Sequence, residues 1–300
     1  MKGSDQVGAS DTTGRPSPFL RWAGSKRWLL PIIADLIPQD FNRYYEPFLG
    51  SGSVFFSFAA GHPALLSDVI HPLIGCYNVV RDNPLGISKK ISEWPVNSEA
   101  YYQIRSKQFE SGTLDAAARF IYLNRYCYNG LYRENSSGLF NVPFGRPKNT
   151  NAIPVGNLVA CSARLRNRVE LKVADFEDAL EDVRDGDLVY LDPPYVAGHR
   201  SNGFVDYNAK IFSWDDQRRL ASVFHKVDSM GAYVISTNAN HDSVSALYHK
   251  FARLPISRYS SMSGKLAGRG ASAELIILGS RLTRGNSDRT DFSDSIRYPR

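Results

Sequence analysis

The chain has 300 residues, of which 43% are hydrophobic and 22% are charged, and its formal net charge is +6 at pH 7. This length and apolar content suffice for one α/β domain with an insertion and a sizeable core. No apolar run is long enough to span a membrane, and the first residues lack the apolar region of a signal peptide. We therefore expect a cytoplasmic protein without a membrane anchor, and the positive charge permits an anionic partner without establishing one.

The two ends of the chain have no pattern of a folded element, and the cysteines have no pattern of a disulfide or metal site. Residues 1–17 and 284–300 are dominated by small polar and charged side chains, and we expect both segments to be disordered. Cys76, Cys127 and Cys161 are odd in number and scattered, which favours neither a disulfide framework nor a zinc site. Since the six histidines also form no pair with metal-ligand spacing, we expect no metal.

Strands and helices alternate in the first part of the chain. An apolar segment at 19–26 leads into a predicted helix at 27–37, and a short strand at 44–48 runs into a glycine-containing loop. A helix at 54–60 and a strand at 64–67, which ends at Asp68, come next. The apolar spacing of the following residues predicts a helix through Leu73, Tyr77 and Val80.

The alternation stops over residues 83–155. Helical patterns occupy 85–93, 98–110 and 114–128, and a turn at 135–138 before 139–142 indicates a hairpin. We predict that 83–155 is an inserted module.

Alternation then resumes and completes the sheet. The sequence predicts a strand at 169–173, a helix through Leu180, a buried strand at 188–191, a helix at 214–230, a strand at 232–236, an edge segment at 254–259 and a strand at 274–279. The predicted fold class is α/β, a mostly parallel sheet covered by helices, whose catalytic domain is formed by 18–82 and 156–283.

The segment Asp192-Pro193-Pro194-Tyr195 follows the buried strand at 188–191. It places an acceptor-rich turn and an aromatic ring at the carboxyl end of a strand, where open α/β sheets bind ligands. Proline lacks an N–H and has a restricted φ, so the carbonyls of this stiff turn can face a ligand. The combination suits a grip on both hydrogens of an exocyclic amino group. A proline-rich turn without chemistry is the alternative.

A glycine-containing loop at 46–52 lies at the carboxyl end of the strand at 44–48. Its glycines allow a close approach of the backbone to a ligand, and Asp68 at the end of the next strand can accept both ribose hydroxyls. Neither a Gly-Lys-Ser/Thr phosphate loop nor the three-glycine dinucleotide pattern is present. What remains is an adenosine carrier without phosphates, S-adenosylmethionine. Asp175 and Phe176 either hold its adenine or serve as a helix cap and a core ring.

A basic and aromatic stretch runs from Arg119 to Lys148, and Glu134 is its one acid. Tyrosines and amides interleave with the basic residues. We interpret the stretch as a nucleic-acid surface rather than an ordinary basic patch. Its members are Arg119, Tyr122, Asn124, Arg125, Tyr126, Tyr128, Asn129, Tyr132, Arg133, Asn135, Asn141, Arg146 and Lys148.

Taken in order, these segments resemble the Dam-type DNA adenine-N6 methyltransferases, the class in which the cofactor motif precedes the target-recognition region and Asp-Pro-Pro-Tyr follows it. The segments are 19–26 (FLRWAGSK), 46–52 (EPFLGSG), Asp68, 123–133 (LNRYCYNGLYR), 140–146 (FNVPFGR) and 192–195 (DPPY). The resemblance as a whole covers roughly residues 19–280. The resemblance implies a Rossmann-like sheet of the S-adenosylmethionine-dependent methyltransferases with an inserted target-recognition domain of helices and a β-hairpin.

The resemblance also implies residue roles. The cofactor contacts would be Trp22, Lys26, Asp68 and Asp192 with the loop residues Glu46, Pro47, Phe48, Gly50 and Gly52, and the candidates Asp175 and Phe176 would join them if they hold the adenine. The turn at 192–195 would grip a flipped adenine through Asp192 and Tyr195. The contacts with duplex DNA would be Arg21, Tyr128, Asn129, Leu131, Arg133, Pro143 and Arg146. Within that set, Tyr128 would fill the gap left by the base, Asn129 would touch a phosphate, and Leu131 and Arg133 would read base edges.

The likeness through 128–133 and 140–146 makes GATC the expected site, and relatives of this type are usually monomers. The chain has Gly24-Ser25-Lys26 where relatives commonly have Gly-Gly-Lys. The basic loop Ser263–Arg269 is a further candidate contact with the DNA backbone.

Two other functions stay open. Cytosine-N4 methylation uses the same geometry, although those enzymes more often carry serine at the position of Asp192. A DNA-binding module without catalysis would usually have lost its strand-end acids and aromatics, and this chain keeps Asp68, Asp192 and Tyr195. Carbon-5 cytosine methylation is set aside, because no cysteine here has the context of its nucleophile.

Overall fold

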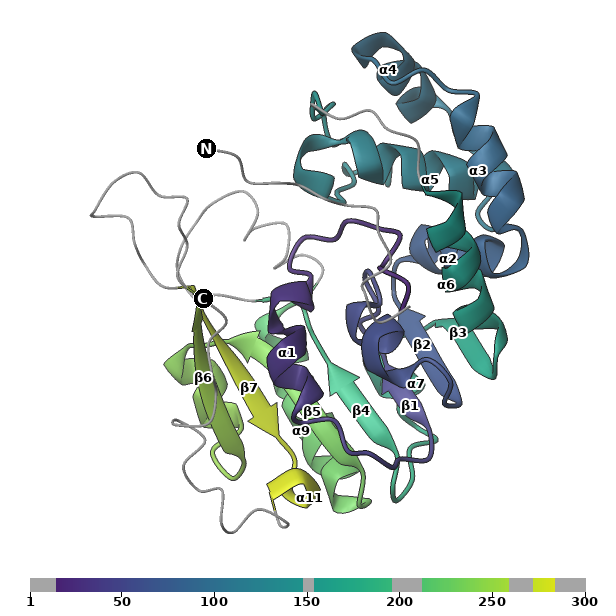
Figure 1. The fold of residues 1–300 in the computed structure, drawn as a ribbon. Coiled ribbons are helices and arrows are strands. Elements are labelled where there is room, and N and C mark those ends of the chain that lie inside the picture. Colours follow the sequence, from purple (N-terminus) through teal and green to yellow (C-terminus); the bar gives the residue numbers. More distant parts are fainter. Residues whose placement is uncertain (1–14, 148–153, 196–211, 259–271, 284–300) are drawn as a thin grey trace, which may run out of the picture. The chain divides into compact units, whose positions relative to one another are not determined.

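A computed structural model describes residues 15–147, 154–195, 212–258 and 272–283 (Figure 1). Most of both ends predicted to be disordered, and the loop Ser263–Arg269, lie outside the described residues. The chain divides into two compact units, the first formed by Met1–Asp35 and Leu49–Asp175 and the second by Leu36–Phe48 and Phe176–Arg300. The domain boundaries expected at 82/83 and 155/156 stay a prediction.

Where its residues are described, the second unit contains five strands in the order β1-β4-β5-β7-β6. Their bounds are β1 Tyr44–Glu46, β4 Leu188–Leu191, β5 Tyr233–Ala239, β6 Ala252–Arg258 and β7 Ser272–Leu278. The strands β1, β4 and β5 run parallel, whereas β7 is antiparallel to β5 and β6. All four residues of β4 are buried, as its unbroken apolar sequence predicts for a central parallel strand.

The helices of the second unit are α7 Phe176–Ala179, α9 Trp214–Ser229, α10 Asp242–Leu247 and α11 Ser280–Thr283. The helix α9, predicted at 214–230, begins at a capping box in which Ser213 and Asp216 satisfy each other's backbone N–H groups. It buries Leu220, Val223, Phe224 and Val227, which lie on one face at helical spacing. Neither α10 nor α11 was predicted, because both are short and α10 buries only Val244.

The first unit contains β2 Ala64–Asp68 and β3 Val169–Val173, which pair in parallel along their whole length. The larger helices are α2 His71–Asp82, α3 Pro84–Ser92, α5 Leu114–Tyr126 and α6 Val155–Arg166. Both α2 and α3 pack on α5 and α6 (Figure 1). The sequence did not predict α6, whose apolar positions are interspersed with Ser and Arg.

The other described helical segments complete the first unit. They are η1 Lys26–Leu29, α1 Leu30–Ala34, η2 Phe55–Ala59, α4 Ser98–Ser106 and η3 Tyr128–Gly130. The predictions for α1, α4 and α5 ran several residues too far at the carboxyl end. Extended backbone at Lys107 and Cys127 ends α4 and α5 before the predicted points.

The predicted turn at 135–138 is present, but regular hairpin strands do not flank it. The Asn135 carboxamide oxygen accepts from the N–H groups of Ser137 and Leu139, both at 3.0 Å. Two isolated antiparallel bridges, Cys127 with Phe144 and Glu134 with Phe140, join the two arms. Among the described residues, no helix has the length and apolar character that a membrane crossing requires.

Candidate active site

The carboxyl ends of β4 and β5 bring Asp192 and Thr237 together. The two strands are parallel and Leu191 lies opposite Ser236, so the next residue on each strand also lies side by side. The Thr237 hydroxyl, which is fully buried, donates to Asp192 Oδ1 at 2.8 Å. The Tyr190 hydroxyl lies 3.3 Å from the Thr237 oxygen. The carboxylate of Asp192 is therefore held by a hydroxyl that is itself fixed in the sheet.

Tyr195 and Glu274 lie near this carboxylate. Burial raises the pKa of Tyr195 well above its ordinary value, and the negative charges of Asp192 and Glu274 raise it further. Burial and Asp192 raise the pKa of Tyr190 in the same direction. Both phenols thus stay protonated beside carboxylates. A site with this balance of charge favours a group that becomes positive during the reaction.

The remaining candidates of the second unit lie after β1 and at the start of α7. Glu46 is buried and accepts a hydrogen bond from the Tyr44 hydroxyl at 2.9 Å. The ring of Phe48 stacks on Phe176 at 5.5 Å, and Phe212 packs edge-on against Phe48. Phe176 is thus a core ring of this unit, one of the two roles expected for it. Its contact with an adenine stays a prediction.

For three predicted proline residues of the second unit, the structure shows the degree of burial. Pro47 and Pro193 are buried, and Pro194 is half-buried. Asp175, the last residue of the first unit, directly precedes α7, where a helix cap would lie.

In the first unit, Asp68 holds the loop that contains Gly50. Its two carboxylate oxygens accept from the N–H groups of Gly50 and Ile70, each at 3.1 Å. The Tyr77 hydroxyl donates to the Gly50 carbonyl at 3.0 Å. Burial raises the pKa of Asp68 to about 6, although the backbone N–H groups oppose this shift. The carboxyl group is therefore mostly ionised at pH 7 and becomes protonated as the pH falls through about 6.

Gly50 and Gly52 have left-handed backbone with φ of 47° and 64°. A Cβ at Gly50 would come within 2.8 Å of the Trp22 ring, and one at Gly52 would come within 3.2 Å of the Tyr77 hydroxyl. Both the backbone angle and the close neighbours thus require glycine. The absence of side chains leaves the loop backbone able to approach a ligand.

The segment with Trp22 and Lys26 is tied to the same loop by serines. The Ser25 and Ser53 hydroxyl oxygens lie 2.9 Å apart, and the Ser51 hydroxyl lies within hydrogen-bond distance of both. Lys26 is buried and its ammonium donates to the Gly24 carbonyl at 2.9 Å. Ser25 has φ −50° and ψ 129°, so a serine fits there without strain.

The arms around the turn at 135–138 carry the predicted DNA contacts. Tyr128 and Asn129 are exposed, and the Tyr128 N–H donates to the Pro143 carbonyl at 2.9 Å. The Arg133 guanidinium donates to the Asn141 carboxamide oxygen at 2.7 Å. The structure therefore brings the 128–133 and 139–146 segments side by side.

The other predicted contacts lie in the same unit. Leu131 is half-buried, whereas Pro143 and Arg146 are exposed, and Arg146 has a left-handed φ of 47°. Arg21 is exposed, and its backbone N–H and carbonyl both bond to the Asn124 carboxamide, at 2.8 and 2.6 Å.

Two functional candidates were not predicted from the sequence, Thr237 and Glu274. Asn124, which was expected on a nucleic-acid surface, is buried and bonds to the backbone of Arg21 instead. The polar end of the strand at 232–236 was a signal for Thr237. No local pattern distinguishes Glu274 at an antiparallel strand or Asn124 on the buried face of α5, because their roles depend on distant partners.

The sequence matches one family over residues 22–262, that of the D12 class N6 adenine-specific DNA methyltransferases. The chain belongs to this family. The methyltransferase is 35% identical over 268 residues to the type II methyltransferase M1.LlaDCHI of Lactococcus lactis subsp. cremoris, a match that spans 87% of this chain and 94% of that relative. It is 34% identical to the DNA adenine methylase of Serratia marcescens, over 87% of this chain and 97% of the relative. The DNA N-6-adenine-methyltransferase of Escherichia phage P1 is 32% identical, but the match spans only 35% of that longer protein.

The hydrogen bond from Thr237 to Asp192 generates a prediction for the methyltransferase. Thr237→Val keeps the shape of the side chain and removes the hydroxyl. Hydrogen bonds to charged groups contribute about 1.5–3 kcal/mol, so we expect turnover to fall by about 10- to 150-fold. Thr237→Ser, which keeps the hydroxyl, is the matched control and should retain most activity. Equal turnover of the valine variant and the wild type, measured as labelled methyl incorporated into DNA, would contradict the assignment.

Proposed function

We propose that this methyltransferase transfers a methyl group from S-adenosylmethionine to N6 of an adenine flipped out of duplex DNA, within the site GATC. The observation that carries the proposal is the Asp192 carboxylate, fixed by Thr237 at the carboxyl end of β4 in a site with Tyr195. The choice of GATC rests on the likeness of the 128–133 and 140–146 segments to those of Dam-type enzymes.

The residues present fit S-adenosylmethionine as the donor. Two glycines with left-handed backbone, where a side chain would be strained, bend the loop beneath Trp22, and a buried carboxylate, Asp68, lies against it. The donor supplies a methyl group made electrophilic by a positive sulfur. Trp22, Lys26, Asp68 and the loop would hold it from the first unit. The resemblance assigns further donor contacts to Glu46, Pro47, Phe48, Phe176 and Asp192, which belong to the second unit.

The second unit, through Asp192 and Pro193, would activate the adenine amino group. Its nitrogen is a poor nucleophile, because its lone pair is delocalised into the ring. Hydrogen bonds from N6 to the Asp192 carboxylate and the Pro193 carbonyl favour a geometry in which the lone pair is localised on nitrogen. The new N–C bond then forms as the methyl leaves sulfur, and the positive nitrogen loses one proton to water. Positioning and fixed dipoles supply most of the gain in rate.

The base has to leave the helix before this step. Extrusion costs a few kcal/mol. Stacking against Tyr195 returns about 1–3 kcal/mol of that cost. The exposed Tyr128 would fill or prop the gap left in the duplex.

Membership of an adenine-specific family disfavours the cytosine-N4 alternative. Methyl transfer from labelled S-adenosylmethionine to matched duplexes tests the proposal as a whole. One duplex carries GATC, one carries GATC already N6-methylated on both strands, and one carries a scrambled site. We expect incorporation into the first alone, and none with Asp192→Ala, which should still bind DNA. Equal incorporation into all three would exclude GATC specificity, and no incorporation by the wild type would favour a DNA-binding module without catalysis.

The raised pKa of Asp68 predicts how cofactor binding depends on pH. Ribose hydroxyls donate to the ionised carboxylate, and protonation below a pKa of about 6 removes an acceptor. The affinity for S-adenosylhomocysteine should therefore fall as the pH is lowered from 7 to 5, by up to about tenfold for each pH unit below the pKa. Calorimetry across this range measures it. Asp68→Asn should bind weakly at every pH without this inflection, and a flat profile for the wild type would refute the role.

The contact of Arg133 with Asn141 leads to a prediction about specificity. If the Arg133 guanidinium reads a base edge, Arg133→Ala should lose about 1–3 kcal/mol of discrimination at one base position. The measurement compares kcat/KM on GATC with kcat/KM on each single-base variant. Arg133→Lys keeps the charge but not the planar fork, so it should also relax specificity. Unchanged discrimination by both variants would count against this role.

A further inference from the structure

The Trp22 ring contacts both Gly50 of the glycine-containing loop and Tyr132 of the segment 128–133, which we propose reads DNA. On one side it lies against Gly50, where a Cβ would come within 2.8 Å of it. On another side it stacks on Tyr132, with ring centroids 5.7 Å apart and planes 20° from parallel. Tyr132 lies between Leu131 and Arg133, the residues proposed to read bases. The stacking of Trp22 on Tyr132 thus links the proposed cofactor site directly to the proposed base-reading side chains. Trp22, Gly50 and Tyr132 all belong to the first unit.

The Tyr132 side chain is fixed from several directions. Its ring packs against Phe120 of α5 at 5.5 Å and against Phe140 of the opposite arm at 5.8 Å. Its hydroxyl donates to the Glu134 carboxylate. Successive side chains of an extended segment point to opposite sides, so a ring packed inward at 132 turns Arg133 outward, where it is exposed. The position of Tyr132 therefore sets the direction of the side chain proposed to read DNA.

A second link joins the same two segments through backbone. The Asn124 carboxamide bonds to the N–H and carbonyl of Arg21, and its nitrogen also donates to the Gly130 carbonyl at 3.5 Å. Gly130 has φ 64°, and a Cβ there would come within 2.6 Å of the Arg21 Cβ. A shift of Arg21 and Trp22 therefore displaces residues 130–132 as well.

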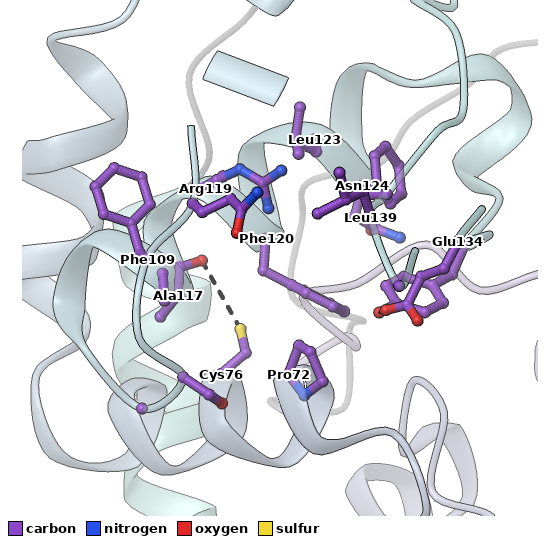
Figure 2. Close-up of a pocket in the computed structure, with 17 residues that line it drawn as sticks. Pro72, Cys76, Phe109, Ala117, Arg119, Phe120, Leu123, Asn124, Glu134 and Leu139 are labelled. Atoms are coloured by element: carbon purple, nitrogen blue, oxygen red, sulfur yellow. Dashed lines mark hydrogen bonds between the residues drawn. The ribbon is translucent and has the colours of Figure 1, made fainter. Parts of the chain in front are cut away.

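A pocket of about 170 Å³ lies beside Tyr132 and leaves its surroundings incompletely packed. Arg119, Phe120, Leu123 and Asn124 of α5 line it together with Glu134 and Leu139 of the arms (Figure 2). Close-packed side chains transmit displacement but resist it. The pocket leaves unfilled space on a side of Tyr132 that its contacts with Trp22, Phe120 and Phe140 do not occupy.

We infer that Tyr132 is a positioning residue that couples cofactor binding at Trp22 to base reading by Leu131 and Arg133. The inference rests on the proposed function. A ligand that fixes Trp22 against the loop also fixes Tyr132, and the base-reading arm is then ordered before DNA arrives. The coupling is reciprocal, so specific DNA has to tighten cofactor binding by the same factor.

The test measures a ratio of dissociation constants. The affinity for a GATC duplex is measured with and without S-adenosylhomocysteine, for the wild type, Tyr132→Leu and Tyr132→Phe. We expect the cofactor product to tighten DNA binding of the wild type by about 5- to 150-fold. Tyr132→Leu loses the stack, and its ratio should fall to between one and about two, with a similar loss when the order of addition is reversed. Tyr132→Phe keeps the stack and should keep the ratio.

A purely structural role predicts a different result. In that case Tyr132→Leu weakens both binary affinities and leaves the ratio unchanged, which would overturn the inference. If Tyr132→Leu does not fold, Phe120→Leu provides the same test, because it removes the ring that supports Tyr132 without touching Gly50 or Arg133. Methyl transfer by the wild type on the same duplex separates the two proposals. Transfer without coupling overturns this inference alone, and absence of transfer overturns the proposed function.

Discussion

The parallel register of β4 and β5 is the constraint on which the candidate active site depends. It places Asp192, which follows β4, beside Thr237 of β5. The Thr237 hydroxyl therefore reaches the Asp192 carboxylate. A carboxylate that has to grip one amino group cannot rotate freely, because a misdirected acceptor loses most of its effect on the reacting nitrogen. The buried sheet supplies this rigidity, since Leu188–Leu191 and Thr237 have almost no exposure.

In the first unit, the loop around Gly50 and Gly52 has an open backbone that is nevertheless held in place. The two left-handed glycines keep it open, and Asp68 supplies the restraint by accepting from the N–H groups of Gly50 and Ile70. Burying that carboxylate raises its pKa, so the restraint carries an electrostatic cost that hydrogen bonds only partly offset. The same loop supports Trp22, whose ring reaches Tyr132, and the unit thereby joins the proposed cofactor loop to the segment proposed to read DNA.

Local pattern was enough to predict β3, β4 and α9, because β3 alternates apolar and polar residues, β4 is an unbroken apolar run and α9 has apolar residues at helical spacing. The same reasoning located Asp68 and Asp192, since both are polar residues at the ends of buried strands. It missed α6, whose polar residues interrupt the apolar spacing, and it ran past the ends of α4 and α5, where single extended residues stop the helix. The polar end of a strand marked Thr237, but its bond to Asp192 and the stacking of Tyr132 on Trp22 could not be predicted, because each depends on a partner far away in the sequence.

The central claim is that Asp192 binds the amino group of the target base. The most direct test compares two DNA duplexes in two forms of the protein. Dissociation constants are measured, with S-adenosylhomocysteine present, for GATC duplexes that carry either adenine or purine at the target position. Purine lacks the exocyclic amine. The account predicts that the change from adenine to purine weakens binding by the wild type more than binding by Asp192→Ala, because only the wild type can use the amine. An identical ratio of dissociation constants in the two proteins would contradict it.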